Sequence, residues 1–463
     1  MTAEERIKGR KIGVVGMARS GMAAAKLARR YGGFPFVSDA APSVKLHTRT
    51  KELSEVGIPF ETDGHTERLL KCDYLVLSPG VPLTIDILRQ AVQNGIPCFS
   101  ELEFASWLCS GPIVAVTGSN GKTTTTALLG EIFTAAGFDT HLCGNIGLPL
   151  AEVVERITER SIAVVEVSTF QLETIADFRP HVAVILNLTP DHLDRHGTFE
   201  KYKEIKYRVT ENQTVDDYLI LNREDAETMA DNPETEAARL YFSTAERNGA
   251  ASYVENEVLY AGVKDQPVPV IRCEEIALPG PHNLQNVSAA TVVARLFDID
   301  VAVITDVLRS FAGVEHRLEN VGTVAGVKFV NDSKATNVDA VCYALKSVKE
   351  PVCLICGGRD KGGSYAPIVD AGRDRLKGLV VIGEAREKIF DALGRAFPVQ
   401  FAVDLEEAVE KGFEMAVPGE TVLLSPGCSS FDMFANYEER GRTFKLAVRA
   451  LKESKNSDEK ISR

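Results

Sequence analysis

The chain has 463 residues, which predicts two or three domains, with 44% hydrophobic and 25% charged residues as in ordinary globular proteins. A net charge of −13 and the absence of a long basic run argue against nucleic-acid binding and membrane-surface binding. No apolar run is long enough to span a membrane, the N-terminus lacks a secretory core, and nine scattered cysteines fit a reducing cytoplasm.

The first block, residues 1–110, begins like a nucleotide-binding α/β unit. Its pattern predicts a strand over Lys11–Val15, a glycine turn over 16–21, a helix to about Tyr31, and a strand over Pro35–Ser38. Asp39, at the end of that second strand, suits a ribose hydroxyl. Ala18 replaces the second glycine of the dinucleotide fingerprint, so a purely structural βαβ unit stays open as the alternative.

The second block, residues 111–313, contains the most informative stretch. A predicted strand over Ile113–Val116 runs into Thr117-Gly-Ser-Asn-Gly-Lys-Thr123 and then a predicted helix over 123–136. Such a turn aims backbone N–H groups and a helix N-terminus at an anion, while Lys122 can reach terminal phosphates and Thr123 can ligate Mg²⁺. Only two residues separate the glycines instead of the usual four, so an ordinary strand-to-helix turn remains the alternative.

Two further strands of this block end in polar side chains. Continuous apolar runs over 163–167 and 182–188 predict buried parallel strands, whose carboxyl ends meet at one sheet edge. Glu166 ends the first and offers a carboxylate to Mg²⁺, and Asp191-His-Leu-Asp-Arg-His196 follows the second, with His192 as the best imidazole candidate. We expect a phosphate–metal site at this edge, against the alternative of a solvated loop.

The third block, residues 314–452, repeats the α/β pattern. Predicted strands end near residues 331, 355, 382 and 424, and the loops that follow are polar: Asn331–Asn337, Cys356–Lys361 and Ser425–Ser430. Such loops could bind phosphoryl charge or a small carboxylate, or they could simply cap helices. Cys353 and Cys356 have metal spacing but sit in a strand-like run, which favours buried thiols. Residues 453–463 are expected to form a polar tail.

Taken together, these motifs resemble those of the Mur ligases, the ATP-dependent amino-acid ligases of peptidoglycan assembly. The matching stretches span nearly the whole chain: 16–21, 78–80, 117–123, 144–149, 166–173, 191–196, 282–286, 316–317, 331–337 and 425–430.

The resemblance implies a fold and a reaction. The implied fold is α/β in three domains: a Rossmann-like UDP-substrate domain (1–110), a P-loop ATPase domain (111–313) and a Rossmann-like amino-acid domain (314–452). The implied reaction adds D-glutamate to UDP-N-acetylmuramoyl-L-alanine. ATP phosphorylates the substrate carboxylate, and the amine then attacks the acyl phosphate. The resemblance further implies one or two Mg²⁺ ions, a carbamylated lysine, and a cytoplasmic monomer.

The resemblance also assigns residues. It implies ATP contacts from Gly118, Asn120, Gly121, Lys122, Thr123, Thr124, Asn283, Asn286, Arg317, Asp332 and Lys334. It implies UDP-substrate contacts from Arg19, Ser20, Asp39, Gly80, Asn145, Ser168 and His192. It implies D-glutamate contacts from Thr336, Lys361, Ser430, Phe431 and Tyr437. Catalytic roles fall on Lys122, Glu166, His192 and Lys206, and metal ligation on Thr123, Glu166, His192 and Lys206 as its carbamate.

Two departures and four alternatives accompany this prediction. Ala40-Ala41-Pro42 stands where relatives often have a polar or basic nucleotide contact, and Tyr437 stands where they often have Phe. Another Mur-type ligase or a folylpolyglutamate-type ligase is the enzymatic alternative. A non-catalytic nucleotide-binding regulator and an oxidoreductase are the alternatives from other classes.

Overall fold

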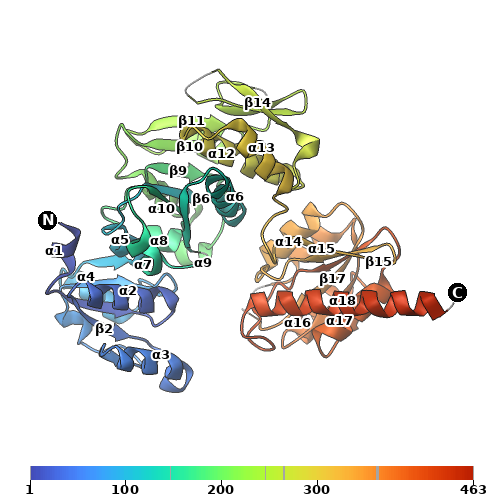
Figure 1. Cartoon of the computed structure of the whole chain (residues 1–463). Helices are drawn as coiled ribbons and strands as arrows, with labels where there is room; N and C mark the ends of the chain where they lie inside the picture. The colour runs from blue at the N-terminus through green and yellow to red at the C-terminus, as the bar shows by residue number, and fades with distance from the viewer. Residues whose placement is uncertain (1, 146, 246, 264–265, 361–363, 462–463) are drawn as a thin grey trace. The chain divides into compact units, whose positions relative to one another are not determined.

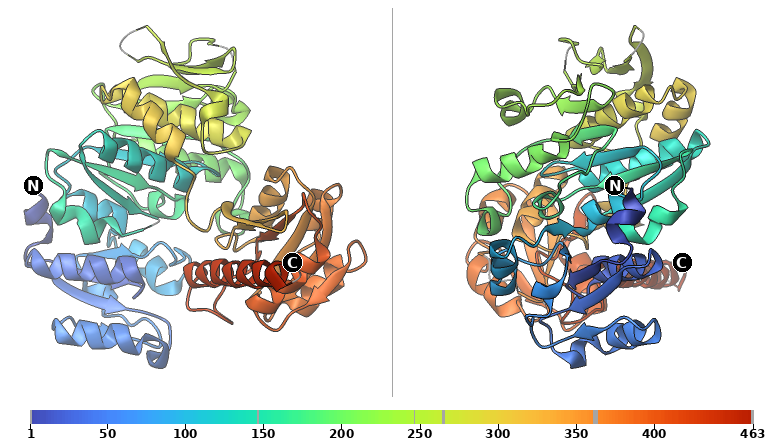
Figure 2. Two further views of the ribbon diagram at one scale, coloured as in Figure 1. Left: turned by 45° about the vertical axis from the view of Figure 1, so that its right-hand side comes forward. Right: turned by 90° about the vertical axis from the view of Figure 1, so that its left-hand side faces the viewer.

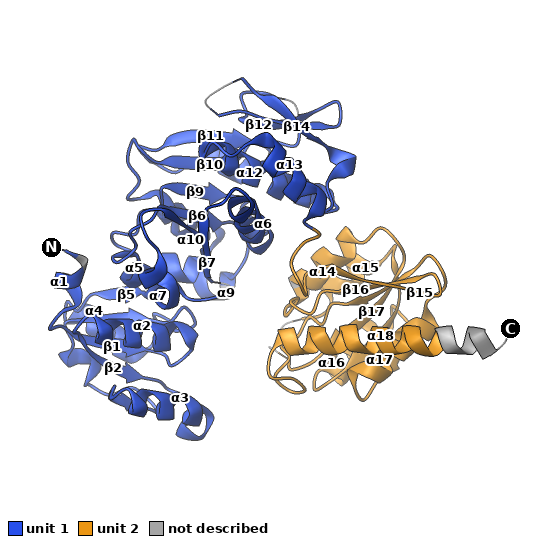
Figure 3. Cartoon of the chain, in the orientation of Figure 1, with its two compact units in different colours: residues 1–311 blue, residues 312–463 orange. Residues whose placement is uncertain are grey.

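The computed structural model describes residues 2–145, 147–245, 247–263, 266–360 and 364–461. It contains three separate β-sheets that follow one another along the chain (Figures 1 and 2). Residues 1–311 form one compact unit, which contains two of the sheets, and residues 312–463 form a second unit with the third (Figure 3). The chain therefore has the α/β class that its sequence predicts.

The first sheet is entirely parallel and has the order β3-β2-β1-β4-β5. This order places the β1–α2 turn next to the point where the chain switches direction across the sheet, the usual ligand position in such folds. Its strands are β1 (Lys11–Val15), β2 (Phe34–Ser38), β3 (Phe60–Glu61), β4 (Tyr74–Leu77) and β5 (Cys98–Ser100). Its helices are α1 (Ala3–Ile7), α2 (Arg19–Arg30), α3 (Ser43–Glu55), α4 (Asp86–Gln93) and α5 (Glu101–Ser106).

The second sheet has nine strands in the order β14-β13-β12-β11-β10-β9-β6-β8-β7, parallel from β12 to β7. The strands are β6 (Ile113–Thr117), β7 (Asp139–Gly144), β8 (Ser161–Glu166), β9 (Val182–Ile185), β10 (Tyr218–Asn222), β11 (Ala238–Phe242), β12 (Ser252–Glu255), β13 (Val258–Ala261) and β14 (Val268–Arg272). The helices are α6 (Lys122–Ala135), α7 (Leu150–Val153), α8 (Thr169–Leu172), α9 (Leu193–His196), α10 (Phe199–Tyr207), α11 (Ala226–Ala230), α12 (Pro281–Leu296) and α13 (Val301–Ser310).

The continuous apolar strands of this sheet are explained by the two cores that they separate. Alternate residues of β6 join different clusters: Ile113 and Ala115 pack with helices α7, α8 and α10, whereas Val114 and Val116 pack with α6 and α12. Because both faces are covered, no polar alternation is needed. Polar side chains follow the ends of these strands, and the candidate site lies at that edge of the sheet.

The third sheet has the order β15-β16-β20-β17-β18-β19, with only the β15–β16 pair antiparallel. Its strands are β15 (Glu319–Val324), β16 (Val327–Asn331), β17 (Val352–Gly357), β18 (Leu376–Ile382), β19 (Val399–Phe401) and β20 (Thr421–Leu424). Its helices are α14 (Val338–Ser347), α15 (Pro367–Gly372), α16 (Arg386–Leu393), α17 (Leu405–Met415) and α18 (Tyr437–Ile461).

Two details of this unit bear on the sequence predictions. Cys353 and Cys356 are buried in β17, as the buried-strand interpretation expects. Their side chains face opposite cores, so the two thiols cannot bind the same metal ion. Residues 453–463 were expected to form a polar tail, and in the structure α18 continues to Ile461. Its Lys- and Glu-rich end has good helix formers, which lets the helix extend. No helix among the described residues combines the length and apolarity that a membrane crossing requires.

Candidate active site

The loop between β6 and α6 is shaped to receive an anion. Gly118 and Gly121 adopt φ of 144° and 85°, conformations that favour glycine, and a Cβ on Gly121 would lie 2.2 Å from Asn286 Oδ1. The Lys122 ammonium donates hydrogen bonds to the carbonyls of Gly118 (2.7 Å) and Ser119 (2.9 Å). The backbone N–H groups at the start of α6 and this ammonium therefore lie at the same loop, which is an arrangement that attracts phosphate.

The end of β9 fixes this loop from one side. Asn187 Oδ1 accepts a hydrogen bond from Asn120 N (2.8 Å), and Asn187 Nδ2 donates to Asn120 O (3.2 Å). Thr123 and Thr124 are buried in the first turn of α6. The loop is thus held by the neighbouring strand, and two hydroxyl side chains lie at its exit.

The start of α12 adjoins the same loop. Asn286 is buried and donates from Nδ2 to Asn283 Oδ1 (3.1 Å), and Asn283 donates from Nδ2 to Pro279 O (2.6 Å). The close approach of Asn286 to Gly121 brings both predicted asparagines to the loop.

Glu166 offers a buried carboxylate oxygen at the end of β8. The residue is 1% exposed, and its Oε1 accepts from Asn145 Nδ2 (2.9 Å). Within the described part of the chain, Oε2 is buried and accepts no hydrogen bond. A buried oxygen without a partner is costly, and carboxylate oxygen is a preferred ligand of Mg²⁺. The geometry of Glu166 therefore fits a divalent cation.

Lys206, on α10, is buried beside the same loop. It is 2% exposed, its Nζ donates a long hydrogen bond to Thr117 Oγ1 (3.4 Å), and Nζ lies 4.8 Å from the centre of the Tyr202 ring. Burial lowers the pKa of this amine well below its usual range, and the nearby charge of Lys122 lowers it further. Burial and the adjacent cation therefore favour the neutral amine.

His192 lies near α8 through an aromatic contact. Its backbone is left-handed (φ 51°), its N–H donates to Asp191 Oδ1 (2.9 Å), and its side chain is 46% exposed. The imidazole centre is 4.9 Å from that of Phe170 in α8. Ser168 precedes that helix, and its N–H and hydroxyl both donate to Gln171 Oε1. The structure thus brings His192 near the α8 segment.

The residues predicted to bind the UDP-substrate in the first sheet contact backbone groups and neighbouring loops. Asp39 accepts from Met17 N (2.6 Å) and Ala41 N (2.8 Å), so both carboxylate oxygens hold backbone amides of two loops. Arg19 donates hydrogen bonds to Gly147 O (2.9 Å) and to Glu152 Oε2 of α7 (3.2 Å). Ser20 lies in the first turn of α2, and Gly80 follows β4.

In the second unit, the ends of β16 and β20 meet at Asp332. This buried carboxylate accepts from Ser425 Oγ (2.8 Å) and Leu318 N (3.3 Å). Burial raises its pKa to about 7, although the charges of Arg317 and Lys334 act in the opposite direction. Arg317 and Lys334 therefore lie close enough to Asp332 to act on it electrostatically.

A buried arginine joins two loops that carry predicted D-glutamate residues, the loop with Thr336 and the loop with Ser430. Arg440 is 1% exposed and donates to Ser333 Oγ (3.0 Å), Ser333 O (2.8 Å) and Cys428 O (3.2 Å). Its role could not be predicted, because a lone Arg in a polar helix carries no sequence signal.

Four of the five predicted D-glutamate residues can be located. Ser430 is buried and Phe431 exposed, Thr336 is partly buried, and Tyr437 O accepts from Ser333 Oγ (2.8 Å). Lys361 lies outside the described residues.

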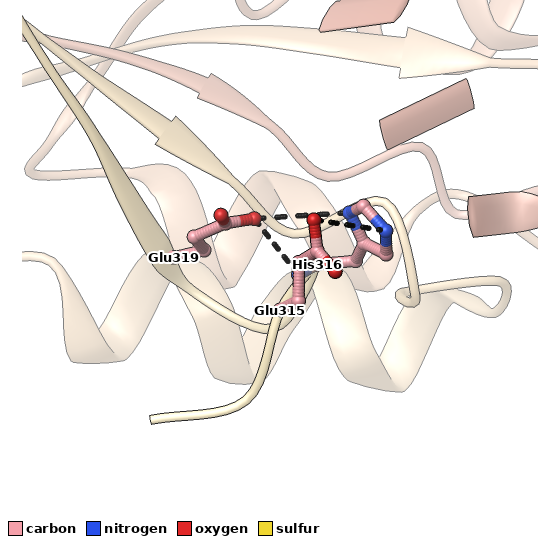
Figure 4. A group of neighbouring side chains, drawn as sticks. All are labelled: Glu315, His316 and Glu319. Carbon is pink, nitrogen blue, oxygen red and sulfur yellow. Dashed lines mark hydrogen bonds and ion pairs between the residues drawn. The ribbon is translucent and has the colours of Figure 1, made fainter. Parts of the chain in front are cut away.

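A carboxylate–imidazole group near this region is an ion-pair network. Glu315, His316 and Glu319 bring their polar atoms within 4.8 Å of one another (Figure 4). The Lys445 ammonium donates to both carboxylates, at 2.9 Å for Glu319 Oε1. Because an ammonium already bridges the two carboxylates, the group joins α18 to the 315–319 loop and needs no metal.

Comparison with known proteins supplies the family. Residues 11–85 match the MurD N-terminal domain, 116–294 the Mur ligase middle domain, and 316–428 the Mur ligase glutamate ligase domain. A protein from Thermoanaerobacter sp. (strain X514), named UDP-N-acetylmuramoylalanine–D-glutamate ligase, is 42% identical over 96% of this chain and 99% of its own. A protein of the same name from Salinibacter ruber is 43% identical over 97% of this chain and 100% of its own.

Solved structures agree in fold. The UDP-N-acetylmuramate–alanine ligase MurC from Thermotoga maritima has a TM-score of 0.58 at 19% identity, covering 95% of this chain and 99% of that one. The MurF ligase from the same organism, solved in complex with ADP, has a TM-score of 0.56 at 16% identity, covering 96% and 97%. On the sequence matches above, the chain belongs to the Mur ligase family.

Proposed function

We propose that this protein is the ATP-dependent ligase that joins D-glutamate to UDP-N-acetylmuramoyl-L-alanine. The observation that carries this proposal is the 41–43% identity, over nearly the whole chain, to relatives named for that reaction. A carboxylate is a poor electrophile. Transfer of the γ-phosphoryl group of ATP to it forms an acyl phosphate, the D-glutamate amine attacks that carbonyl, and phosphate leaves with the C–O bond electrons.

The β6–α6 loop is our proposed ATP site. Lys122 neutralises charge on the β- and γ-phosphates, while the backbone of Gly118, Asn120 and Gly121 and the first turn of α6 with Thr123 and Thr124 surround them. Asn283 and Asn286 contact the nucleotide from α12. This proposal is supported by the hydrogen bonds of Lys122 to the loop carbonyls and by the approach of Asn286 to Gly121. In the second unit, Arg317, Asp332 and Lys334 are proposed as further ATP contacts.

Glu166, Thr123, His192 and carbamylated Lys206 are our proposed protein ligands for one or two Mg²⁺ ions, directly or through water. When bound, Mg²⁺ neutralises phosphate charge and orients the transferring group. The unpartnered Oε2 of Glu166 supports a cation there.

The buried Lys206 supports carbamylation, since only a neutral amine can attack CO₂. The step forms an N–C bond, releases one proton, and leaves a carboxylate that is a better ligand than an ammonium.

Substrate contacts follow the same resemblance. Arg19, Ser20, Asp39, Gly80, Asn145, Ser168 and His192 are proposed to bind the UDP-substrate. The two backbone hydrogen bonds of Asp39 make loop positioning part of its role. Thr336, Lys361, Ser430, Phe431 and Tyr437 are proposed to bind D-glutamate, with Lys361 pairing a substrate carboxylate.

The broader assignments are proposals as well. We infer a UDP-substrate domain over 1–110, an ATP-binding domain over 111–313 and an amino-acid domain over 314–452. We propose a cytoplasmic location, because the nine cysteines scattered through the sequence fit a reducing compartment. A monomer is the simplest state for the enzyme. A folylpolyglutamate-type ligase is disfavoured by the MurD N-terminal match over residues 11–85.

Phosphate release tests the proposed reaction. The purified protein is incubated with ATP, Mg²⁺ and UDP-N-acetylmuramoyl-L-alanine, and amino acids are added one at a time. Release that requires D-glutamate and is absent with L-glutamate supports the proposal. Equal release with L-alanine, L-lysine or diaminopimelate would assign a different ligase.

A further inference from the structure

Arg195 connects loops of two different sheets. It lies in α9, three residues after His192, and its guanidinium pairs in bidentate fashion with Glu173, from Nε to Oε1 (3.1 Å) and from Nη2 to Oε2 (2.5 Å). Both side chains are largely buried. Paired contacts of this kind fix the plane and direction of a guanidinium, so the remaining donors point in defined directions.

Those remaining donors reach the backbone on either side of Gly80. Arg195 Nη2 donates to Val81 O (3.2 Å), and Nη1 makes a longer contact with Pro79 O (3.4 Å). The 79–81 loop follows β4 of the first sheet, whereas α9 follows β9 of the second. One guanidinium therefore ties the carboxyl end of a strand in the first sheet to the second.

The flat face of the same guanidinium has a third partner. It lies 4.3 Å from the centre of the Phe170 ring, which in turn lies 4.9 Å from the imidazole of His192. Glu173 also lies within 3.3 Å of His196 Nδ1. Movement of Arg195 would thus disturb the 79–81 loop and the packing of His192 together.

We propose that Arg195 is a positioning residue that sets the distance between the 79–81 loop and His192, and so the fit of the UDP-substrate between them. This inference rests on the proposed function, in which Gly80 and His192 contact that substrate. Arg195 itself touches only backbone carbonyls, Glu173 and Phe170 in these contacts. Its removal should weaken binding of the UDP-substrate selectively, because the ATP loop has other supports.

Arg208 offers a matched control. Its guanidinium also holds the 172–175 segment, through Leu172 O (2.8 Å), Glu173 O (2.7 Å) and Ile175 O (2.7 Å), and it pairs with Glu211. Among the contacts of the described residues, none joins Arg208 to the 79–81 loop. Loss of Arg208 therefore reproduces the local damage to α8 without loss of the connection between the sheets.

The experiment compares Arg195→Met, Arg195→Lys and Arg208→Met in the full-length protein. Steady-state kinetics give KM for UDP-N-acetylmuramoyl-L-alanine, ATP and D-glutamate, and amide hydrogen exchange is followed in the peptide covering residues 75–90. We expect Arg195→Met to raise the UDP-substrate KM about tenfold or more, with the ATP KM within about twofold, and to speed exchange in that peptide about tenfold. Arg195→Lys should be intermediate, because an ammonium cannot serve Glu173 and both carbonyls. Arg208→Met should leave the 75–90 exchange unchanged.

The outcomes separate this inference from the proposed function. Unchanged exchange in the 75–90 peptide of Arg195→Met would overturn it, as would equal KM increases for all substrates or for both Met variants. Lack of D-glutamate-dependent activity in the wild type would refute the proposed function instead, and the exchange comparison would still decide whether Arg195 holds the loop. If Arg195→Met does not fold, Arg195→Lys against Arg208→Met provides the same test.

Discussion

Replacement of the buried Lys206 by Met should abolish activity and make the protein more stable. The side chain is enclosed, and its only hydrogen bond among the described contacts is the long one to Thr117 Oγ1. Met has a similar length, and its burial requires neither the loss of a proton nor the burial of an amine. We expect the free energy of unfolding to rise in Lys206→Met while ligase activity falls by a factor on the order of 10² or more.

The size of the stability gain follows from the pKa. An amine with the ordinary pKa of 10.5 costs about 5 kcal/mol to deprotonate at pH 7, which is the ceiling for the gain. Replacement of buried ion pairs by apolar side chains of similar volume can stabilise a protein by about 1–4 kcal/mol, and we expect the gain to lie in that range, below the ceiling.

The pH dependence has a definite sign. Burial lowers the pKa of Lys206 in the folded protein, so the unfolded chain binds the proton more tightly. The free energy of unfolding of the wild type should therefore rise with pH, by up to about 1.4 kcal/mol per pH unit. This rise should occur between the lowered pKa of Lys206 in the folded protein and its ordinary pKa in the unfolded chain. Met does not titrate, so the advantage of the variant should shrink over the same range.

Urea unfolding from pH 7 to pH 9, in metal-free buffer depleted of CO₂, measures this difference. Lys201→Met in the same helix is the control, because Lys201 is 53% exposed and its pair with Glu204 lies on the surface. Such a change should alter stability by less than about 0.5 kcal/mol. Two results would refute this reasoning: a Lys206→Met protein that is less stable than the wild type, or a stability gain that does not vary with pH. Either result would mean that Lys206 stays charged in the folded protein and that its charge is balanced by nearby groups.

Three further predictions follow from other parts of the site. Lys122→Ala should lower kcat by about 10²–10³ with an unchanged circular dichroism spectrum, and near-normal turnover would mean that the loop does not hold phosphate. Gly121→Ala should raise the ATP KM and lower Tm more than Gly137→Ala, because both glycines have φ of 85° but only the first would place a Cβ against Asn286; equal effects would contradict the steric argument. Asp332→Asn should stabilise the second unit, since burial raises the Asp332 pKa to about 7 and its ionisation destabilises the folded state from about pH 4 to pH 7. Thermal unfolding should show the gain growing over that range and levelling off above it, whereas a gain that is largest at pH 4 would refute this.

Local pattern predicted the parts of the fold that depend on local chemistry. The strand over residues 11–15 matches the predicted bounds, and β20 ends at Leu424, where a predicted strand was expected to end. The helix predicted over residues 123–136 begins one residue earlier, at Lys122. These segments are apolar runs or glycine turns whose character is visible in a few residues. The last turns of α18 were not predicted from the sequence. Polar residues are compatible both with a solvent-exposed helix and with a chain that has left the helix, so they do not show where the helix ends.

The sequence could not reveal contacts between distant segments. Arg195 and Arg440 donate hydrogen bonds to backbone carbonyls of distant segments. Every residue has such a carbonyl, so the sequence does not identify the acceptor. The burial of Lys206 is equally hidden, because Tyr202-Lys-Glu-Ile-Lys-Tyr207 contains two lysines and the pattern does not say which faces inward. Asp39 was predicted to contact a ribose hydroxyl. In the structure its carboxylate accepts hydrogen bonds from two backbone N–H groups, which the sequence did not reveal.

The fate of the substrate carboxylate oxygens tests the central claim most directly. UDP-N-acetylmuramoyl-L-alanine carrying ¹⁸O at both carboxylate oxygens is incubated with the protein, ATP, Mg²⁺ and D-glutamate, and phosphate and product are analysed by mass spectrometry. The account predicts one ¹⁸O in the released phosphate and one in the new amide carbonyl. Unlabelled phosphate, or a product that keeps both labels, would contradict activation of that carboxylate as an acyl phosphate.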